Sequence, residues 1–352
     1  MSLGAPLAGS HTSHAASRSA VVGGALLVAS ALLVLVGAGV GSTGFSSLWQ
    51  AWDDALSRQI VWDIRLPRTL GAWLAGALLG LAGAVAQGLF RNPLADPYLL
   101  GSASGASVGV AAALALMGIS PMSLQWMARL GITGAAFVGA VLAVLLTLLL
   151  AKGVGHTLRL LLAGVVVGVV LGALASMITL LSPDILQAMQ AFMLGSTGFV
   201  GWAACAIMGA VLLVCLAAAV LLSRVLDGLS LGEATAQSLG LQLPQLRAAL
   251  VVVLALATGT AVAQTGLIAF VGLAAPHLVR AAVKAKYATL LCLSALMGAV
   301  LLSAADVLAR WLVAPQELPV GVLTAVLGGG YLLWLMHRGQ AVYHHGKDGK
   351  IL

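Results

Sequence analysis

Long apolar runs separated by short polar segments make up most of the sequence. A helix needs about 20 consecutive apolar residues to cross the hydrocarbon core of a bilayer. In lipid the backbone must satisfy its own hydrogen bonds, so runs of this length are predicted to be helices rather than strands. We expect ten of them, at residues 20–41, 68–90, 94–117, 126–151, 158–181, 198–222, 244–264, 267–282, 288–311 and 320–336. The pattern therefore predicts an all-α polytopic membrane protein with about ten transmembrane helices.

The composition supports this prediction and argues against a soluble fold. The 352 residues are 61% hydrophobic and 8% charged, whereas soluble domains carry about 25% charged residues. So few charges cannot cover a surface that faces water. We expect one transmembrane domain at residues 19–338, after a disordered N-terminal segment (1–18) and before a polar tail (339–352).

The basic residues predict which side of the membrane each loop occupies. Twelve of the 17 Lys and Arg residues fall on one side if the N-terminus is cytoplasmic, as the positive-inside rule requires. Ten helices then return the basic C-terminal tail to the cytoplasm. The formal net charge of +7 is accordingly interpreted as a topology signal and not as a nucleic-acid surface.

The positions of the three cysteines do not indicate a disulfide or a metal site. Cys205, Cys215 and Cys292 each lie in an apolar run, and the sequence has no Cys-x-x-Cys pair or Cys/His cluster. We therefore expect no disulfide framework, no metal site and no cofactor bound by this chain.

Glycines recur at helical spacing in two of the predicted helices. Gly164, Gly168 and Gly172 share one helix face, and Gly76 and Gly80 share another. Small residues at this spacing let helix backbones approach closely in a membrane. Static packing within one subunit is preferred here to a moving or dimerising interface.

The predicted cytoplasmic loop at residues 226–243 has the marks of a short helix. Ser230 and Glu233 have the spacing of a capping box, and Gly240 sits where a helix C-terminus favours a left-handed residue. Isolated helices this short are marginal in water, so the helix is expected to pack on something. A static surface turn is the alternative.

Several segments together resemble the permeases that import iron siderophores, haem and vitamin B12. The resemblance runs from about residue 62 to residue 334. Its motifs are IRLPR at 64–68, NPLADPYLLG at 92–101, LLAGV at 161–165, LSLGEATAQSLG at 229–240, GLIAFVGLAAPHLVR at 266–280 and ELPVGVLT at 317–324. Two segments depart from the family pattern, TGLIAF at 265–270 and the triple glycine at 328–330. Both departures affect expected local helix bending.

The resemblance implies an importer of several subunits in the bacterial inner membrane. Two copies of the permease would enclose a pore, two cytoplasmic ATPases would grip the loop helices, and a periplasmic binding protein would deliver cargo. The sequence lacks the Gly-x-x-x-x-Gly-Lys-[Ser/Thr] phosphate loop, so ATP and Mg²⁺ belong to the partner and the chain is not itself an enzyme. The residues expected to couple to the ATPase are Ser230, Leu231, Gly232, Glu233, Ala234, Ala236, Leu239 and Gly240.

The resemblance also implies a contact with the binding protein. Arg65, Arg68 and Arg310 match family positions that face outwards and pair with carboxylates of that partner. Arginine forks bind carboxylates specifically. The alternatives are interface anchoring for Arg65 and Arg68, and an i, i+4 pair with Asp306 for Arg310.

A mostly apolar pore is expected, because the predicted helices hold almost no ionisable residues. The candidate lining is Met177, Thr179, Leu180, Met189, Gln190 and Met193, with ordinary packing as the alternative. Methionine adapts to bulky, partly apolar cargo. Haem is the preferred cargo, and a ferric siderophore or cobalamin remains open.

The sequence argues against two functions from other classes. An intramembrane enzyme would need an active-site constellation, and the sequence has neither H-E-x-x-H nor G-x-S-x-G. An ion-coupled secondary transporter would need intramembrane carboxylates. Uptake without any ATPase subunit would favour the transporter.

Overall fold

The computed structural model describes residues 9–41, 44–45, 54–117, 126–151, 157–238 and 240–345, and almost all of them are helical. The α-helices are α1 (Gly9–Gly39), α3 (Ala55–Ile60), α4 (Leu66–Leu89), α5 (Ser102–Met117), α6 (Trp126–Leu150), α7 (Thr157–Leu181), α8 (Leu186–Leu194), α9 (Trp202–Leu221), α10 (Ser223–Ser230), α11 (Glu233–Ser238), α12 (Leu243–Thr265), α13 (Val271–Ala282), α14 (Tyr287–Trp311) and α15 (Val320–His345). A π-helix, η1 (Val61–Arg65), and two short 3-10 helices, η2 (Pro97–Leu100) and η3 (Pro183–Ile185), join some of them, and β1 (Val40–Gly41) pairs with β2 (Gly44–Phe45).

Seven helical stretches in the described part of the chain are long and apolar enough to cross a membrane. They are Ser17–Gly39, Ala55–Leu89, Gly131–Leu150, Leu158–Leu181, Trp202–Leu221, Leu243–Thr265 and Tyr287–Trp311, and two shorter apolar helices are Ser102–Leu116 and Val320–Trp334. An all-α polytopic membrane protein is therefore confirmed. The count of ten spanning helices and the cytoplasmic position of both termini stay predictions.

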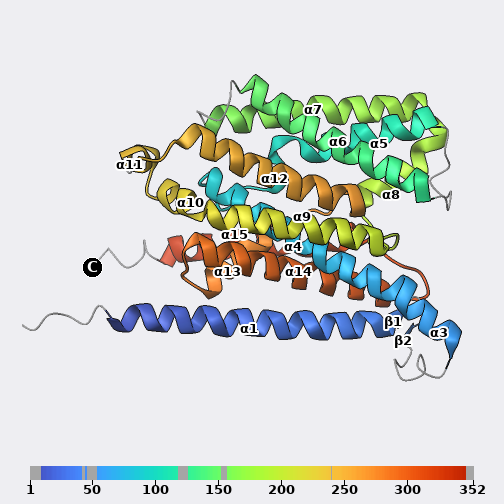
Figure 1. Cartoon of the computed structure of the whole chain (residues 1–352), viewed down its shortest axis with the longest axis horizontal. Helices are drawn as coiled ribbons and strands as arrows, with labels where there is room; N and C mark the ends of the chain where they lie inside the picture. Colours follow the sequence, from blue (N-terminus) through green and yellow to red (C-terminus); the bar gives the residue numbers. More distant parts are fainter. Residues whose placement is uncertain are drawn as a thin grey trace, which may run out of the picture.

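The long helices lie side by side as one bundle. In Figure 1, α1 runs along one edge of the bundle and α7 along the opposite edge, with α4 and α12 between them. We call the two ends of the bundle the α11 end and the α3 end, after the short helices that lie there. The first helix begins at Gly9, so residues 9–18 are helical where disorder was expected.

Helix α4 forms the centre of the bundle because almost all of its side chains are buried. Its closest neighbour is α14. A Cβ atom added at Gly76 or Gly80 would collide with the backbone carbonyl of Gly298 or Ser294, respectively. The two helix backbones therefore touch, which only glycine permits at these positions.

The glycines of α7 also face their own subunit. A Cβ at Gly164 would collide with the carbonyl of Leu99, and Gly168 and Gly172 lie nearest to Ser104. This arrangement matches the static packing that the sequence favoured.

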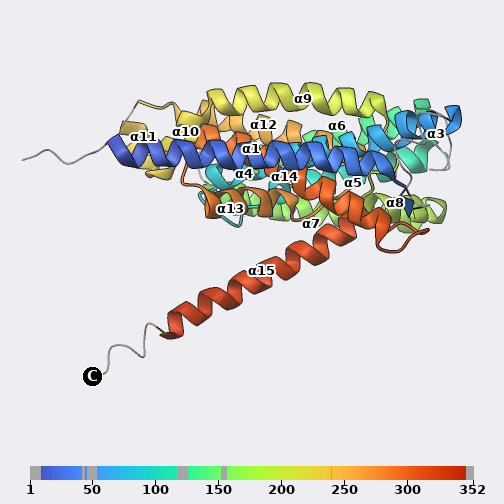
Figure 2. The ribbon, with the colours of Figure 1, turned by 90° about the horizontal axis from the view of Figure 1, so that it is seen from below.

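Helix α15 is the exception to the side-by-side arrangement. It leaves the bundle at an angle, as Figure 2 shows. Its first half is held closely at two glycines: a Cβ at Gly321 would collide with the carbonyl of Leu194, at the end of α8, and a Cβ at Gly328 would collide with Phe270. Many of its apolar side chains are consequently exposed, among them Val326, Leu327 and Leu333.

Candidate functional site

The loop predicted to couple to an ATPase folds as two short helices. Ser230 is the last residue of α10, and its hydroxyl donates to the carbonyl of Asp227 at 2.6 Å. Glu233 begins α11. Gly232 lies between them with φ +113°, a turn that breaks the helix. The predicted capping box between Ser230 and Glu233 is therefore wrong, because the two residues belong to different helices.

Helix α11 is held to α12 by an ion pair on one side and is exposed on the other side. The carboxylate of Glu233 accepts from the Arg247 guanidinium of α12 at 2.5 Å. The side chain of Arg247 is 4% exposed, and Ala236 is fully buried. Leu231, by contrast, is 67% exposed. The element is therefore held in shape while it presents an apolar residue outwards.

The remaining coupling residues fit this picture in part. Ala234 is exposed beside Leu231. Gly240 has φ +79° and donates to the carbonyl of Gln237 at 2.9 Å, so the predicted left-handed residue is confirmed. Leu239 lies outside the described residues.

Asp227 links this loop to the start of α14, a contact that the sequence did not reveal. Its Oδ1 accepts from the backbone N–H of Tyr287 at 3.0 Å. Tyr287 is the first residue of α14, so the carboxylate lies where the helix dipole favours negative charge. A movement of the α10–α11 loop can thus reach the helix that packs on α4.

The α3 end of the bundle holds a buried cluster of charges around Asp306. Asp306 is fully buried in α14 and accepts from Arg68 at 3.3 Å and from Arg310 at 2.6 Å. The hydroxyl of Thr197 donates to the same carboxylate. Arg68 also pairs with Glu317, just before α15, at 2.7 Å. Two positive and two negative charges balance within the cluster.

The structure buries two of the three arginines predicted to dock the binding protein, Arg68 and Arg310, and their docking role stays a prediction. Arg310 is 1% exposed, and Arg68 is 9% exposed. Arg310 also donates to the carbonyls of Gly37 and Val40, at 2.9 and 3.0 Å. Buried charges are retained where they are paired, and the i, i+4 pair of Arg310 with Asp306 is confirmed. Arg65 is partly buried and donates to the carbonyl of Gly39 at 3.1 Å.

A cavity of about 460 Å³ lies beside α8. We call it the α8 cavity. Its lining comes from α5, α7, η3, α8 and the segment after α12, and comprises Ser104, Ser107, Gly172, Ala175, Ser176, Thr179, Leu180, Pro183, Leu186, Met189, Gln190, Met193 and Leu267. Five of the six residues predicted to line the pore are among them, and Met177 is not. The serines of α5 were missed, because their helix is as apolar as its neighbours.

The lining of the α8 cavity is apolar with a few polar groups. The hydroxyls of Ser107, Ser176 and Thr179 donate to carbonyls of their own helices, at 3.0, 3.0 and 2.8 Å. They are therefore already satisfied, whereas the Gln190 side chain is exposed. Mostly apolar cavities with few polar groups are typical of sites for small organic molecules.

The sequence and the fold are similar to those of known transport proteins. The sequence profile described as the FecCD transport family matches residues 25–338. The hemin transport system permease protein of Yersinia pestis is 38% identical over 322 residues, covering 90% of this chain and 95% of that protein. The vitamin B12 import system permease protein of Salmonella typhimurium is 42% identical over 286 residues, covering 81% and 86%. A solved structure of a metal-chelate type ABC transporter in an inward-facing conformation superposes with a TM-score of 0.80 at 28% identity, covering 90% of this chain and 99% of that one.

Proposed function

Because the chain belongs to the FecCD transport family, we propose that it imports haem or another iron chelate from the periplasm into the cytoplasm. The protein is a multi-pass permease subunit of an ABC importer. Two copies form the pore along their common axis in the bacterial inner membrane, each with ten spanning helices and both termini in the cytoplasm.

The observation that carries this proposal is the α8 cavity. Five residues expected from the sequence to line the pore do line this cavity, two from the end of α7 and three from α8, together with residues of α5 and Leu267. Met193 is 56% exposed beside the exposed Gln190 amide. A soft apolar wall with a few polar groups suits a large, partly apolar cargo.

Energy reaches the permease through α11. Two cytoplasmic ATPases bind the exposed side of the α10–α11 loop, around Leu231 and Ala234, and they carry the ATP and Mg²⁺. The Glu233–Arg247 pair holds α11 on α12, so the grip moves the helix bundle as a rigid body.

A periplasmic binding protein docks at the α3 end. Arg65 is the predicted docking residue that is accessible enough to meet a carboxylate of that partner. Arg68 and Arg310 contribute indirectly, because their cluster holds α1, α4 and α14 together beneath the docking face.

Haem is the favoured cargo. The hemin permease of Yersinia pestis matches over 95% of its length, and the vitamin B12 permease over 86% of its own. A ferric siderophore or cobalamin is the alternative within the same importer class, and an ion-coupled secondary transporter is the alternative from another class.

Reconstitution tests the proposal. The permease is inserted into liposomes with its ATPase, and the binding protein is supplied with haemin, a ferric siderophore or cyanocobalamin. We expect uptake of haemin that requires ATP, the ATPase and the binding protein. Uptake of another cargo alone would reassign the substrate, and uptake without the ATPase subunit would overturn the ABC mechanism.

A further inference from the structure

A break in the helices between α12 and α13 lies between two cavities. Residues 266–270 are not helical. Leu267, near one end of this segment, lines the α8 cavity. Phe270, at the other end, lines a second cavity of about 220 Å³, which we call the α15 cavity. Non-helical backbone at membrane depth occurs where it is buried in protein or lines a cavity, and this segment borders both.

The α15 cavity lies between α13, α14 and the start of α15. Its lining is apolar except for the hydroxyls of Thr324 and Tyr331, and comprises Phe270, Val271, Ala274, Leu278, Leu301, Ala305, Thr324, Leu327, Gly328 and Tyr331. Tyr331, one of the lining residues, also contacts two other aromatic side chains. Its ring meets His277 edge-on at 5.9 Å and Trp334 in a stacked arrangement at 6.1 Å.

Phe270 has an unfavourable backbone conformation for an aromatic residue. Its φ is +68°, in the left-handed region that favours glycine. In the described part of the chain, Arg91 is the one other non-glycine residue with positive φ. Phe270 also precedes α13 without any side-chain hydrogen bond to the helix, at a position where Asn, Asp, Ser or Gly is normally preferred.

The side chain, rather than the backbone, therefore explains why a phenylalanine stands here. Four residues earlier, Gly266 meets the same need for positive φ without strain. Strained residues persist where the surrounding structure holds them, and they cluster at switches and ligand contacts.

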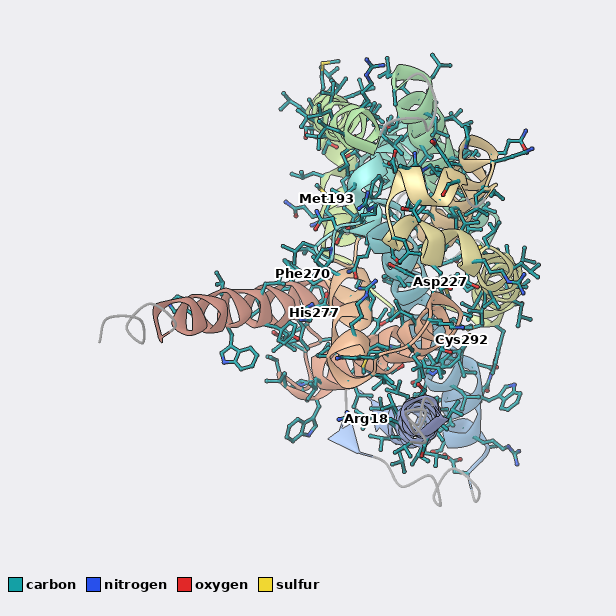
Figure 3. The ribbon with its side chains drawn as sticks, turned by 90° about the vertical axis from the view of Figure 1, so that its left-hand side faces the viewer. Arg18, Met193, Asp227, Phe270, His277 and Cys292 are labelled. Atoms are coloured by element: carbon teal, nitrogen blue, oxygen red, sulfur yellow. The ribbon has the colours of Figure 1, made fainter. Side chains whose placement is uncertain are left out.

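The ring of Phe270 lies against a strip of α15 that has no side chains. A Cβ atom at Gly328 would collide with the Cβ of Phe270. A Cβ at Gly329 would lie 3.9 Å from the tip of the ring, and one at Gly330 would meet nothing within 4 Å. Figure 3 shows Met193, Phe270 and His277 following one another along the side of the bundle from which α15 projects.

We propose that the Phe270 ring is the barrier between the α8 cavity and the α15 cavity, and that it closes against Gly328 and Gly329 of α15. This inference rests on the proposed transport function, for which the two cavities are successive parts of one path. An apolar ring in a narrow apolar passage excludes water and small polar solutes. Tilting α15 away from the bundle removes the surface against which the ring closes, so the position of α15 determines whether the barrier is shut.

Three variants separate a barrier from a structural residue. F270G removes the ring and relieves the strained backbone. F270A removes the ring and keeps the strain. R91G relieves the same kind of strain at Arg91, an exposed residue that lines neither cavity. Each is purified with its ATPase and reconstituted in liposomes that contain self-quenched carboxyfluorescein.

We expect F270G and F270A to release the dye at least about tenfold faster than the unmodified complex, because both open the apolar constriction. F270G should unfold at a higher temperature than F270A, because both lose the ring and F270G alone relieves the strained backbone. R91G should release dye at the unmodified rate.

Two results would overturn the inference: F270G as tight as the unmodified complex, or leakage from R91G equal to that from F270G. The first shows that the ring is no barrier, and the second shows that the leak follows relief of backbone strain. A complex that transports none of the three cargoes would contradict the proposed function, while the dye comparison still decides whether Phe270 separates the cavities.

Discussion

Asp306 is the residue on which the α3 end of the bundle depends. Its carboxylate is fully buried and lies between two arginines from α4 and α14. Removing one partner from a buried ionic cluster leaves uncompensated charge, which costs more than the original cluster contributed. The network therefore makes a single position at this end unusually sensitive to substitution.

Substituting Asp306 by alanine should lower the free energy of unfolding by about 3–5 kcal/mol. Arg68 and Arg310 would then share a buried site in which Glu317 supplies the one remaining negative charge. Denaturant unfolding of the purified protein in detergent measures the change. Asp184, which is exposed, provides the control, and D184A should change stability by less than about 0.5 kcal/mol. Equal effects of the two substitutions would refute the central role of Asp306.

Of the two arginine contacts of Asp306, one could be predicted from the sequence and the other could not. Arg310 and Asp306 are four positions apart, so their pairing could be anticipated. Arg68 and Asp306 are 238 positions apart, and nothing local indicates that they meet. The burial of Arg68 could not be predicted for this reason, since it depends on a carboxylate that the fold brings from elsewhere.

At the scale of elements, the apolar runs were enough to locate the helices, because spanning length and hydropathy are local properties. The ends and breaks were less predictable. Gly232 separates α10 from α11 through its positive φ, whereas the spacing of Ser230 and Glu233 suggested one helix. The positive φ of Phe270 gave no sequence signal, because a phenylalanine rarely adopts it.

Contact between the backbones of α4 and α14 predicts that alanine substitution destabilises the protein at Gly298 but not at Gly24. G298A should lower the free energy of unfolding by about 1–3 kcal/mol, because the new methyl group meets the carbonyl of Gly76. G24A in α1 has no atom within 4 Å of its new methyl group. It should leave stability unchanged or slightly raised, since alanine favours helix over glycine. Thermal unfolding in detergent compares the two, and a stable G298A would argue against the close approach.

The hydrogen bond from Tyr287 to Asp227 predicts a coupling defect. D227A should reduce the amount of cargo transported per ATP hydrolysed, because α14 loses its connection to the α10–α11 loop. D227N keeps an oxygen that accepts the Tyr287 N–H, so it should transport normally. Uptake and phosphate release are measured together in proteoliposomes. The predicted role fails if D227A keeps the unmodified ratio.

For the whole molecule, the proposed transport path and the proposed ATPase-coupling loop lie at different places on one helix bundle. The α8 cavity lies beside η3 and α8, and α11 lies at the opposite end of the long axis (Figure 1). Helices α12 and α14 connect the two regions. Signals between cargo and ATPase must therefore travel along helices, whose backbone hydrogen bonds resist compression.

Filling the α8 cavity should block transport without disturbing the fold. M193W places an indole in a cavity of about 460 Å³, so uptake should fall several-fold while ATP hydrolysis in the absence of cargo continues. M177W changes a methionine of similar exposure that does not line this cavity, at 54% against 56% for Met193. Similar uptake by both variants would show that the cavity is not on the path.

The angle at which α15 leaves the bundle has a mechanical consequence. The helix has 26 residues, so at 1.5 Å per residue it is a lever about 39 Å long. Its fulcrum is the contact of Gly321 with the end of α8, next to the Arg68–Glu317 pair. A rotation of about 10° at the fulcrum displaces the far tip by about 7 Å. Small rearrangements of charge at the α3 end can thus displace the far end of α15 by several ångströms.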